Sequence, residues 1–306
     1  EDALYFRNTI TRYAKRIGVE IKTNCPIVEL MMNDGKIIGV KTGKGQIYKC
    51  EKVIIAAGGM SYPGTGSAGD GYKLAESAGH KIVPVRPSLI PLITETKTAS
   101  RLQGLSLKNV KVRLLIDGRK KHELFGEMLF THFGLSGPVI LSLSKYAVDA
   151  LRDEKAVEIS IDLKPALDEH KLDERLKRDF TEQGKKQFAN ILKGLLPRLL
   201  IDVCIDQNNI PPDKSGNQIK SAERKRLLKW LKDFRFKIAG HRPMEEAIIT
   251  AGGVDTREID PRTMESKLVK GLYFAGEVID IDADTGGYNL QAAFSTGWVA
   301  GGMNQS

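Results

Sequence analysis

Residues 271–297 contain the pattern of a site that binds an anion. The apolar run Leu272–Ala275 predicts a short strand, and Gly286 and Gly287 precede a predicted helix over Asn289–Ala300 whose residues are mostly small and apolar. The first amides of a helix have no acceptor within the helix, and the helix dipole favours negative charge beside them. We therefore expect a phosphate or another anionic group to bind at the start of this helix.

Glu277, which follows Gly276 at the end of the predicted strand, adds an acceptor for hydroxyl groups. A ligand with phosphates and a polyol chain matches both features, and a flavin nucleotide has both. We therefore expect a flavin nucleotide as the cofactor of this site. The alternative is an ordinary core helix, which explains the small apolar residues but not the two glycines that precede them.

Residues 64–69 read Gly-Thr-Gly-Ser-Ala-Gly, which is a literal G-x-G-x-x-G. The dinucleotide fingerprint requires this turn directly after a strand, whereas six residues separate it from the run Val53–Ala57, which predicts a buried parallel strand. We interpret it as a secondary loop that covers a cofactor, with glycines at the strand end allowing close backbone approach. The predicted cofactor contacts in this region are Ala57, Gly58, Gly59, Thr65 and Gly66.

Asp280, Asp282 and Asp284 alternate in the manner of a calcium-binding loop. An EF-hand loop that begins at Asp280 needs Gly at its sixth position and Glu at its twelfth, where this sequence has Thr285 and Gln291. We predict no metal site.

His132 is the histidine with the most suggestive surroundings, because residues 129–138 combine proton carriers with glycines. We expect His132 and Tyr288 to line a substrate pocket, with His132 as a proton carrier. The alternative is a plain connection from a strand to a helix capped by Ser136.

Composition indicates a globular protein of about two domains. Of the 306 residues, 41% are hydrophobic and 28% are charged, and the longest apolar runs are far shorter than the ~20 residues that cross a bilayer. Three cysteines at wide spacing, without Cys-x-x-Cys, favour a reducing cytoplasm over a disulfide scaffold. We expect a cytoplasmic protein that does not enter a membrane.

The net charge of +9 is concentrated in the middle of the chain. Residues 97–242 contain 30 Lys or Arg and 19 Asp or Glu, a net of +11, which leaves −2 for the flanks. This segment could contact nucleic acid or steer an anionic substrate. Because its charges lie on helical patterns without interleaved aromatic residues, we favour a solvated surface and consider nucleic acid an unlikely partner.

Periodicity divides the chain into an α/β domain made of two pieces and an inserted domain. The expected helices and strands are a helix at 2–17, a meander at 27–32, 37–41 and 46–50, a strand at 53–57, a helix at 70–78, strands at 107–116, 122–131 and 156–163, helices at 166–233 interrupted at 211–216, and a strand from Phe234. We predict a discontinuous nucleotide-binding domain (residues 1–84 and 244–306), which the resemblance described below makes an FAD-binding domain. The insertion (residues 85–243) would be β-rich at 85–164 and 234–243 and helical at 165–233.

The first helix has no strand before it, although a crossover helix joins two strands of a parallel sheet. The sequence begins at Glu1. We therefore expect the first domain to be incomplete at its N-terminus.

Taken together, these segments resemble the aminoacetone-oxidase-like, or YhiN-like, family of bacterial FAD-binding oxidoreductases, which are distant relatives of the glutathione-reductase and fumarate-reductase flavoproteins. The matching segments are VIIAAGG at 53–59, YPGTGSAGDGY at 62–72, LFTHFGLSGP at 129–138, AGGV at 251–254 and LYFAGEVIDIDADTGGYNLQ at 272–291. The resemblance implies a Rossmann-like fold of the glutathione-reductase type. It also implies an N-terminal βαβ unit of roughly 30 residues or more that this sequence lacks.

The resemblance also implies roles for individual residues. Ile27 would lie against the adenine through its backbone, and Ala57 and Gly58 would pass close to the cofactor. Gly276, Glu277 and Asp280 would lie near the ribityl chain and phosphates. The residues that would direct amides at the pyrimidine edge of the flavin are Gly287, Tyr288, Asn289 and Leu290, next to Gly286.

Our leading hypothesis is an FAD-dependent oxidoreductase that transfers hydride between flavin and a small organic substrate such as an amine or an enone. NAD(P)H or oxygen would be the second partner, since no second complete fingerprint is present. The alternative is a non-catalytic protein whose basic insertion binds RNA or an acidic partner. The oligomeric state stays open.

Overall fold

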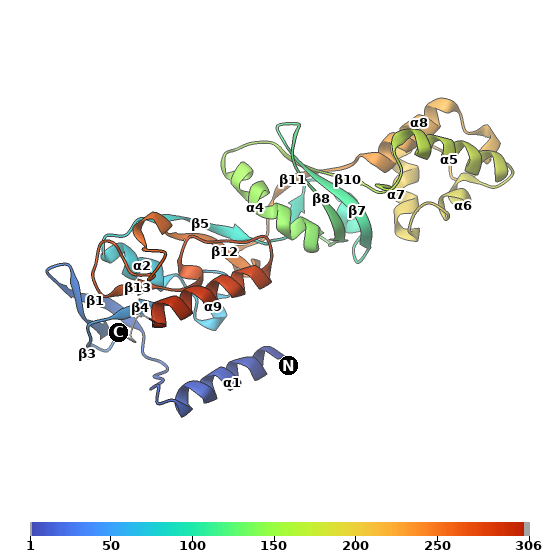
Figure 1. The fold of residues 1–306 in the computed structure, drawn as a ribbon. Coiled ribbons are helices and arrows are strands. Elements are labelled where there is room, and N and C mark those ends of the chain that lie inside the picture. The colour runs from blue at the N-terminus through green and yellow to red at the C-terminus, as the bar shows by residue number, and fades with distance from the viewer. Residues whose placement is uncertain (1, 303–306) are drawn as a thin grey trace.

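The computed structural model describes residues 2–302, which form three parts arranged along an elongated molecule (Figure 1). Both ends of the chain contribute to the first part, a six-stranded barrel forms the second, and a helical cluster at the far end forms the third. The chain is therefore an α/β protein. None of the helices in this range is long and apolar enough to cross a membrane.

The first part begins with the predicted meander. Its strands are β1 (Ile27–Asn33), β2 (Lys36–Thr42) and β3 (Ile47–Lys49), which pair in that order as an antiparallel sheet. Asp34 and Gly35 form the first turn with φ of 48° and 71°, the positive values that a two-residue hairpin turn requires. The predicted meander is confirmed.

A parallel pair of strands joins the two distant pieces of the chain. β4 (Val53–Ile55) pairs in parallel with β13 (Leu272–Phe274), and α2 (Asp70–Ser77) contributes Tyr72 and Ala75 to the core beneath them. The parallel strand predicted over Val53–Ala57 is confirmed in its pairing, but the prediction is wrong about its length and its burial. β4 ends at Ile55, Ile54 is 40% exposed, and Ala57 is exposed, because the strand buries only one of its faces.

Antiparallel strands β5 (Ile82–Ser88) and β12 (Ile249–Val254) connect this part to the barrel. The register of the pair shifts between Ala251 and Gly253, and a Cβ on Gly252 would lie 2.5 Å from the carbonyl oxygen of Pro84. The glycine pair at 252 and 253 is therefore required by strand packing.

The barrel closes in the order β10-β11-β6-β9-β8-β7. Its strands are β6 (Leu92–Thr94), β7 (Ser106–Ile116), β8 (Arg119–Phe130), β9 (Gly134–Ser136), β10 (Val157–Asp162) and β11 (Phe234–His241). α4 (Pro138–Arg152) packs on the barrel through Ile140, Leu143 and Ala147, and a short helix, α3 (Thr98–Arg101), precedes β7. The predicted strands are confirmed, but the N-cap of α4 is Gly137 and not Ser136.

The helical cluster lies between β10 and β11 in the sequence. It contains α5 (Glu169–Glu182), α6 (Phe188–Leu192), α7 (Arg198–Asn208) and α8 (Ser221–Lys232), with the predicted interruption between the last two. Asp168 caps α5 by accepting a hydrogen bond from the amide of Lys171 at 2.7 Å. The helices bury Leu172, Leu176 and Leu227 in the same core as the barrel.

Two helices of the first part expose apolar side chains. α1 (Asp2–Arg16) stands apart from the sheets (Figure 1). Its Phe6 contacts Phe294 of α9 (Gly286–Gly302) edge-on, with ring centroids 5.9 Å apart. The amphipathic helix predicted at the start of the sequence is present, but it leaves Ile10 and Tyr13 exposed. On α9, Trp298 is 82% exposed.

A buried histidine links two loops of the first part. His80 Nδ1 lies 3.0 Å from Glu258 Oε2, and its Nε2 lies 2.7 Å from Ser266 Oγ. The amides of Leu268 and Val269 donate to the same Ser266 oxygen. These contacts suit a neutral ring that donates to Glu258 and accepts from Ser266. Burial lowers the pKa of His80, and the nearby Glu258 offsets only part of that shift.

We expect His80 to make the protein less stable in mild acid. Because its pKa is lower in the folded state, the unfolded chain binds more protons near pH 6.5, so the free energy of unfolding falls as pH falls through that value. Urea unfolding at pH 7.5 and 5.5 should show a smaller difference for His80→Gln than for the wild type. His170→Gln, at an exposed histidine, is the control, and equal differences in all three proteins would contradict the prediction.

Candidate functional site

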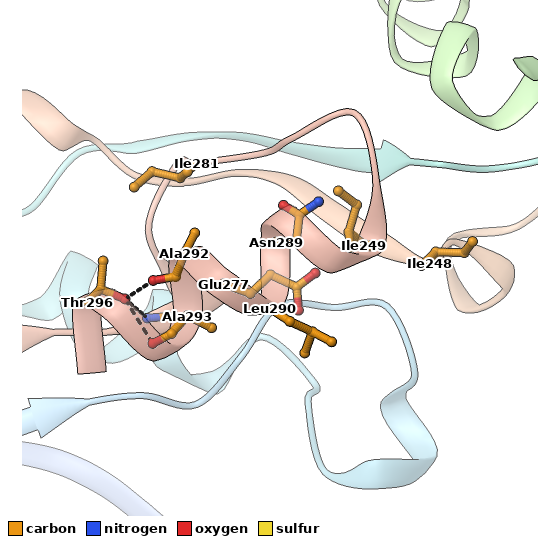
Figure 2. Close-up of a pocket in the computed structure, with 11 residues that line it drawn as sticks. Ile248, Ile249, Glu277, Ile281, Asn289, Leu290, Ala292, Ala293 and Thr296 are labelled. Atoms are coloured by element: carbon orange, nitrogen blue, oxygen red, sulfur yellow. Dashed lines mark hydrogen bonds between the residues drawn. The ribbon is translucent and has the colours of Figure 1, made fainter. Parts of the chain in front are cut away.

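A pocket of about 290 Å³ lies beside the start of α9, at the lower end of the range for small-molecule sites. Its wall combines the start of β12, the turn after β13 and one face of α9 (Figure 2). The lining residues are Ile248, Ile249, Gly276, Glu277, Ile281, Gly286, Asn289, Leu290, Ala292, Ala293 and Thr296. Most of this lining is apolar, as in cofactor sites that exclude water.

The helix at the pocket starts earlier than the sequence predicts. α9 begins at Gly286, so the two glycines form its first turn and do not precede it. Within residues 2–302, the amides of Gly286, Gly287 and Tyr288 have no backbone acceptor, and the first bonded amide is that of Asn289, which donates to the carbonyl of Thr285 at 3.3 Å. The start of α9 thus presents three free amides.

This geometry corrects two predicted roles. The amides of Asn289 and Leu290 are used inside the helix, so they are not free to meet a ligand. The side chain of Asn289 holds the preceding loop, because it accepts from the amide of Ala283 and donates to the carbonyls of Ala283 and Thr285. Both residues still line the pocket through their side chains.

The glycines of the first turn leave space next to the free amides. A Cβ on Gly287 would meet no atom of the protein within 4 Å, and one on Gly286 would approach only Ile248, at 3.8 Å. Gly276 has a φ of 75°, which favours glycine, and its amide donates to Thr296 Oγ1 at 2.9 Å. The turn after β13 is thereby fixed to α9 while the helix end stays open.

Glu277 connects the pocket to the segment after β4. Its Oε1 accepts from the amide of Thr250 at 2.5 Å and from Ser61 Oγ at 3.3 Å. Among the described residues its Oε2 has no hydrogen-bond donor, so this oxygen is available to a ligand hydroxyl. The side chain is half-buried and lies at the pocket beside α9 (Figure 2).

Thr250 is a positioning residue that the sequence did not reveal. Its Oγ1 accepts from the amides of Met60 and Ser61, and a Cβ on Gly59 would collide with its side chain. Gly58 has a φ of 72°, and a Cβ there would lie 2.7 Å from Ser67 Oγ. Both glycines after β4 are therefore explained by contacts within the protein.

The acidic loop before α9 binds α4. Lys145 Nζ lies 2.9 Å from Asp284 and 3.7 Å from Asp282, and Ser142 donates to the carbonyl of Asp284. Burial raises the pKa of Asp280, which lies outside the pocket wall. The described part of the chain contains no cluster of His, Cys, Asp or Glu suited to a metal ion.

The remaining predicted residues lie away from the pocket wall. Ile27 begins β1, and Thr65 and Gly66 form a short turn whose amides bond to Tyr62 and Pro63. Tyr288 is 68% exposed. His132 is exposed between β8 and β9, with its ring centroid 4.9 Å from that of Phe133.

Comparison with known proteins shows the family. Residues 86–249 match the family described as "HI0933-like protein barrel and H2TH domain", in agreement with the observed barrel and helical cluster. This match covers more than half of the chain, which therefore belongs to the HI0933-like family.

Three curated proteins are similar over most of the chain. The ribosomal RNA dihydrouridine synthase of Haemophilus influenzae is 34% identical over 272 residues, which are 89% of this chain and 65% of that protein. The protein of the same name from Escherichia coli is 36% identical over 83% of this chain and 61% of its own length. The 3-dehydro-bile acid delta(4,6)-reductase of Clostridium scindens is 30% identical over 84% of this chain and 63% of its own.

The chain thus spans a little under two thirds of the length of these relatives. Among solved structures, GidA of Aquifex aeolicus aligns with 95% of this chain at 11% identity and a TM-score of 0.32, too low to support an argument. The reductase name of the third relative agrees with the oxidoreductase family predicted from the sequence, and the names of all three mention no cofactor.

Proposed function

We propose that the protein is an FAD-dependent reductase and that the start of α9 holds the ring end of the flavin. The observation that carries this proposal is the set of three free amides at Gly286, Gly287 and Tyr288 beside an apolar pocket. The empty space where a Cβ of Gly287 would lie gives a flat ring close access to these amides. Bound flavin would supply the hydride chemistry.

The residues of this chain would bind the cofactor and set its electrostatics. The free amides and the dipole of α9 favour electron density at the group that they face. Ile249, Ala292 and Ala293 exclude water from one side, and Glu277 Oε2 accepts a hydroxyl of the polyol. The more distant contacts remain part of the proposal, namely Ile27, Ala57, Gly58, Gly59, Thr65, Gly66 and Asp280.

We further propose that the substrate contains a carbon–carbon double bond conjugated to a carbonyl. The names of the relatives share this chemistry, because dihydrouridine is uridine reduced at such a bond and the delta(4,6) bonds of a 3-oxo steroid are conjugated to its ketone. NADH or NADPH would reduce the flavin. His132 and Tyr288 are proposed as substrate contacts on the exposed side of the site.

Stopped-flow measurements on the full-length protein loaded with FAD test this proposal. After anaerobic reduction with NADH or NADPH, we expect a steroid enone or a uridine-containing ribosomal RNA to reoxidise the flavin. A panel of amines mixed with the oxidised enzyme is the counter-test. Reduction of the flavin by an amine, together with reoxidation by oxygen alone, would contradict the proposed reaction.

A further inference from the structure

A second pocket, of about 800 Å³, lies between the barrel and the helical cluster. Residues of β7, of β8, of the link after β10 and of α5 line it. Four of the lining side chains are cations, namely Lys108, Lys111, Lys164 and Arg175, and no Asp or Glu is among the lining residues. The pocket therefore concentrates the positive charge of the basic middle segment.

Two of these cations have no acidic partner within the described residues. Lys111 lies 3.4 Å from Glu123, and Arg175 lies 3.5 Å from Asp179, but neither Lys108 nor Lys164 forms an ion pair there. Burial lowers the pKa of Lys164, and the positive charge of Arg175 lowers it further. Partial burial and the charge of Arg175 both disfavour the charged form of Lys164, and an anion bound beside it would offset that effect.

An irregularity in the backbone of β7 lies at Lys108, one of the cations of this pocket. Between the pairs Leu107–Met128 and Val110–Gly126, Lys108 and Asn109 face a single residue of β8. This is a β-bulge, with Asn109 at a φ of 55°. Bulges redirect side chains and are common beside functional sites.

An exposed aromatic ring borders the same pocket. Phe125 is 62% exposed and is the cross-strand partner of Lys111. An exposed aromatic face next to unpaired cations is the combination that binds single-stranded nucleic acid, because bases stack on the ring while cations hold the backbone.

We infer that this pocket binds single-stranded RNA, with Lys108 and Lys164 at a phosphate and Phe125 stacked on a base. The inference rests on the proposed function in one respect, since it makes RNA the carrier of the double bond that is reduced. The pocket would then anchor the RNA on the barrel, apart from the flavin site.

Fluorescence anisotropy with the full-length protein and a labelled, uridine-rich 12-nucleotide RNA tests the inference. K108A/K164A should lower the slope of log Kd against log salt by about 0.7 for each lost phosphate contact. F125L, which keeps the apolar bulk, should weaken binding roughly 5- to 100-fold through the loss of stacking. K44A, in the turn between β2 and β3, removes one charge outside the pocket and should leave Kd within about twofold, in keeping with the local nature of such contacts.

An unchanged salt slope in K108A/K164A, or unchanged affinity in F125L, would overturn the inference. Displacement of RNA by polyglutamate of equal charge, at equal concentration, would also overturn it in favour of an acidic protein. Failure of the proposed reductase function can be distinguished from failure of the RNA-binding pocket. RNA binding that depends on the pocket in a protein without flavin would refute only the reductase, whereas a flavin-loaded enzyme whose pocket variants bind RNA normally would refute only the pocket.

Discussion

Replacing Gly287 with valine should remove flavin from the full-length protein without unfolding it. The Cβ of Gly287 would point into space that no protein atom occupies within 4 Å, so a side chain is tolerated by the fold. The same side chain would fill the place where the flavin approaches the free amides of the first turn. Loss of close contact should weaken FAD binding roughly tenfold or more, an effect of about 1.4 kcal/mol or above.

Gly297→Val is a matched control, since it is the same substitution in the same helix and its Cβ also meets nothing within 4 Å. Flavin absorbance per protein and the far-ultraviolet circular dichroism of both variants provide the two readouts. We expect normal helicity in both and flavin loss only at position 287. Equal flavin content in the two variants would show that the cofactor does not bind at the start of α9.

Replacing Gly134 with alanine should strongly destabilise the barrel. Gly134 pairs with Ile93 of β6, and a Cβ there would collide with the carbonyl oxygen of Leu92 and lie 2.9 Å from the amide nitrogen of Thr94. These are backbone atoms of a closed barrel, so they cannot move aside. Overpacking of this kind costs about 1–3 kcal/mol or more.

Gly240→Ala gives a matched comparison for that prediction. Gly240 of β11 pairs with the same Ile93 from the other side of β6, and its Cβ would meet nothing within 4 Å. The urea midpoint should fall sharply for Gly134→Ala and change little for Gly240→Ala. Similar midpoints for the two variants would show that β6 can shift to make room.

The different surroundings of Gly134 and Gly240 could not be predicted from the sequence. The segment around His132 suggested chemistry because glycines and a proton carrier lie together in it. The structure explains Gly134 by strand pairing and leaves His132 exposed, and neither fact is visible without knowing that β6 lies beside β9. A glycine in the sequence can indicate a position to which another segment of the chain comes close. It does not identify that segment.

Part of the pocket beside α9 is local in sequence. Gly276, Glu277, Gly286 and Leu290 come together there because a strand, a turn and a helix that follow one another form one unit. Their contact with a flavin stays a prediction. Ile248 and Ile249 arrive from a strand that follows the insertion, so their place depends on tertiary pairing. The early start of α9 was missed because glycine has a low helix propensity, and two glycines in succession therefore predict a segment before the helix and not its first turn.

The pocket lined by Lys108, Lys164 and Phe125 could not be predicted either, because it also depends on tertiary pairing. The charges of the middle segment were interpreted as a solvated surface, because Phe125, Lys108 and Lys164 lie far apart in the sequence. In the barrel, Phe125 of β8 meets Lys108 of β7 and Lys164 after β10 at one pocket. Closure of the barrel brings these three residues together.

A crystal structure of the full-length protein with bound FAD would show directly where the flavin ring lies. We expect polar atoms of the ring within hydrogen-bond distance of the amides of Gly287 and Tyr288, with the ring against Ala292 and Ala293. A flavin bound elsewhere, with these amides facing only solvent or protein, would contradict it.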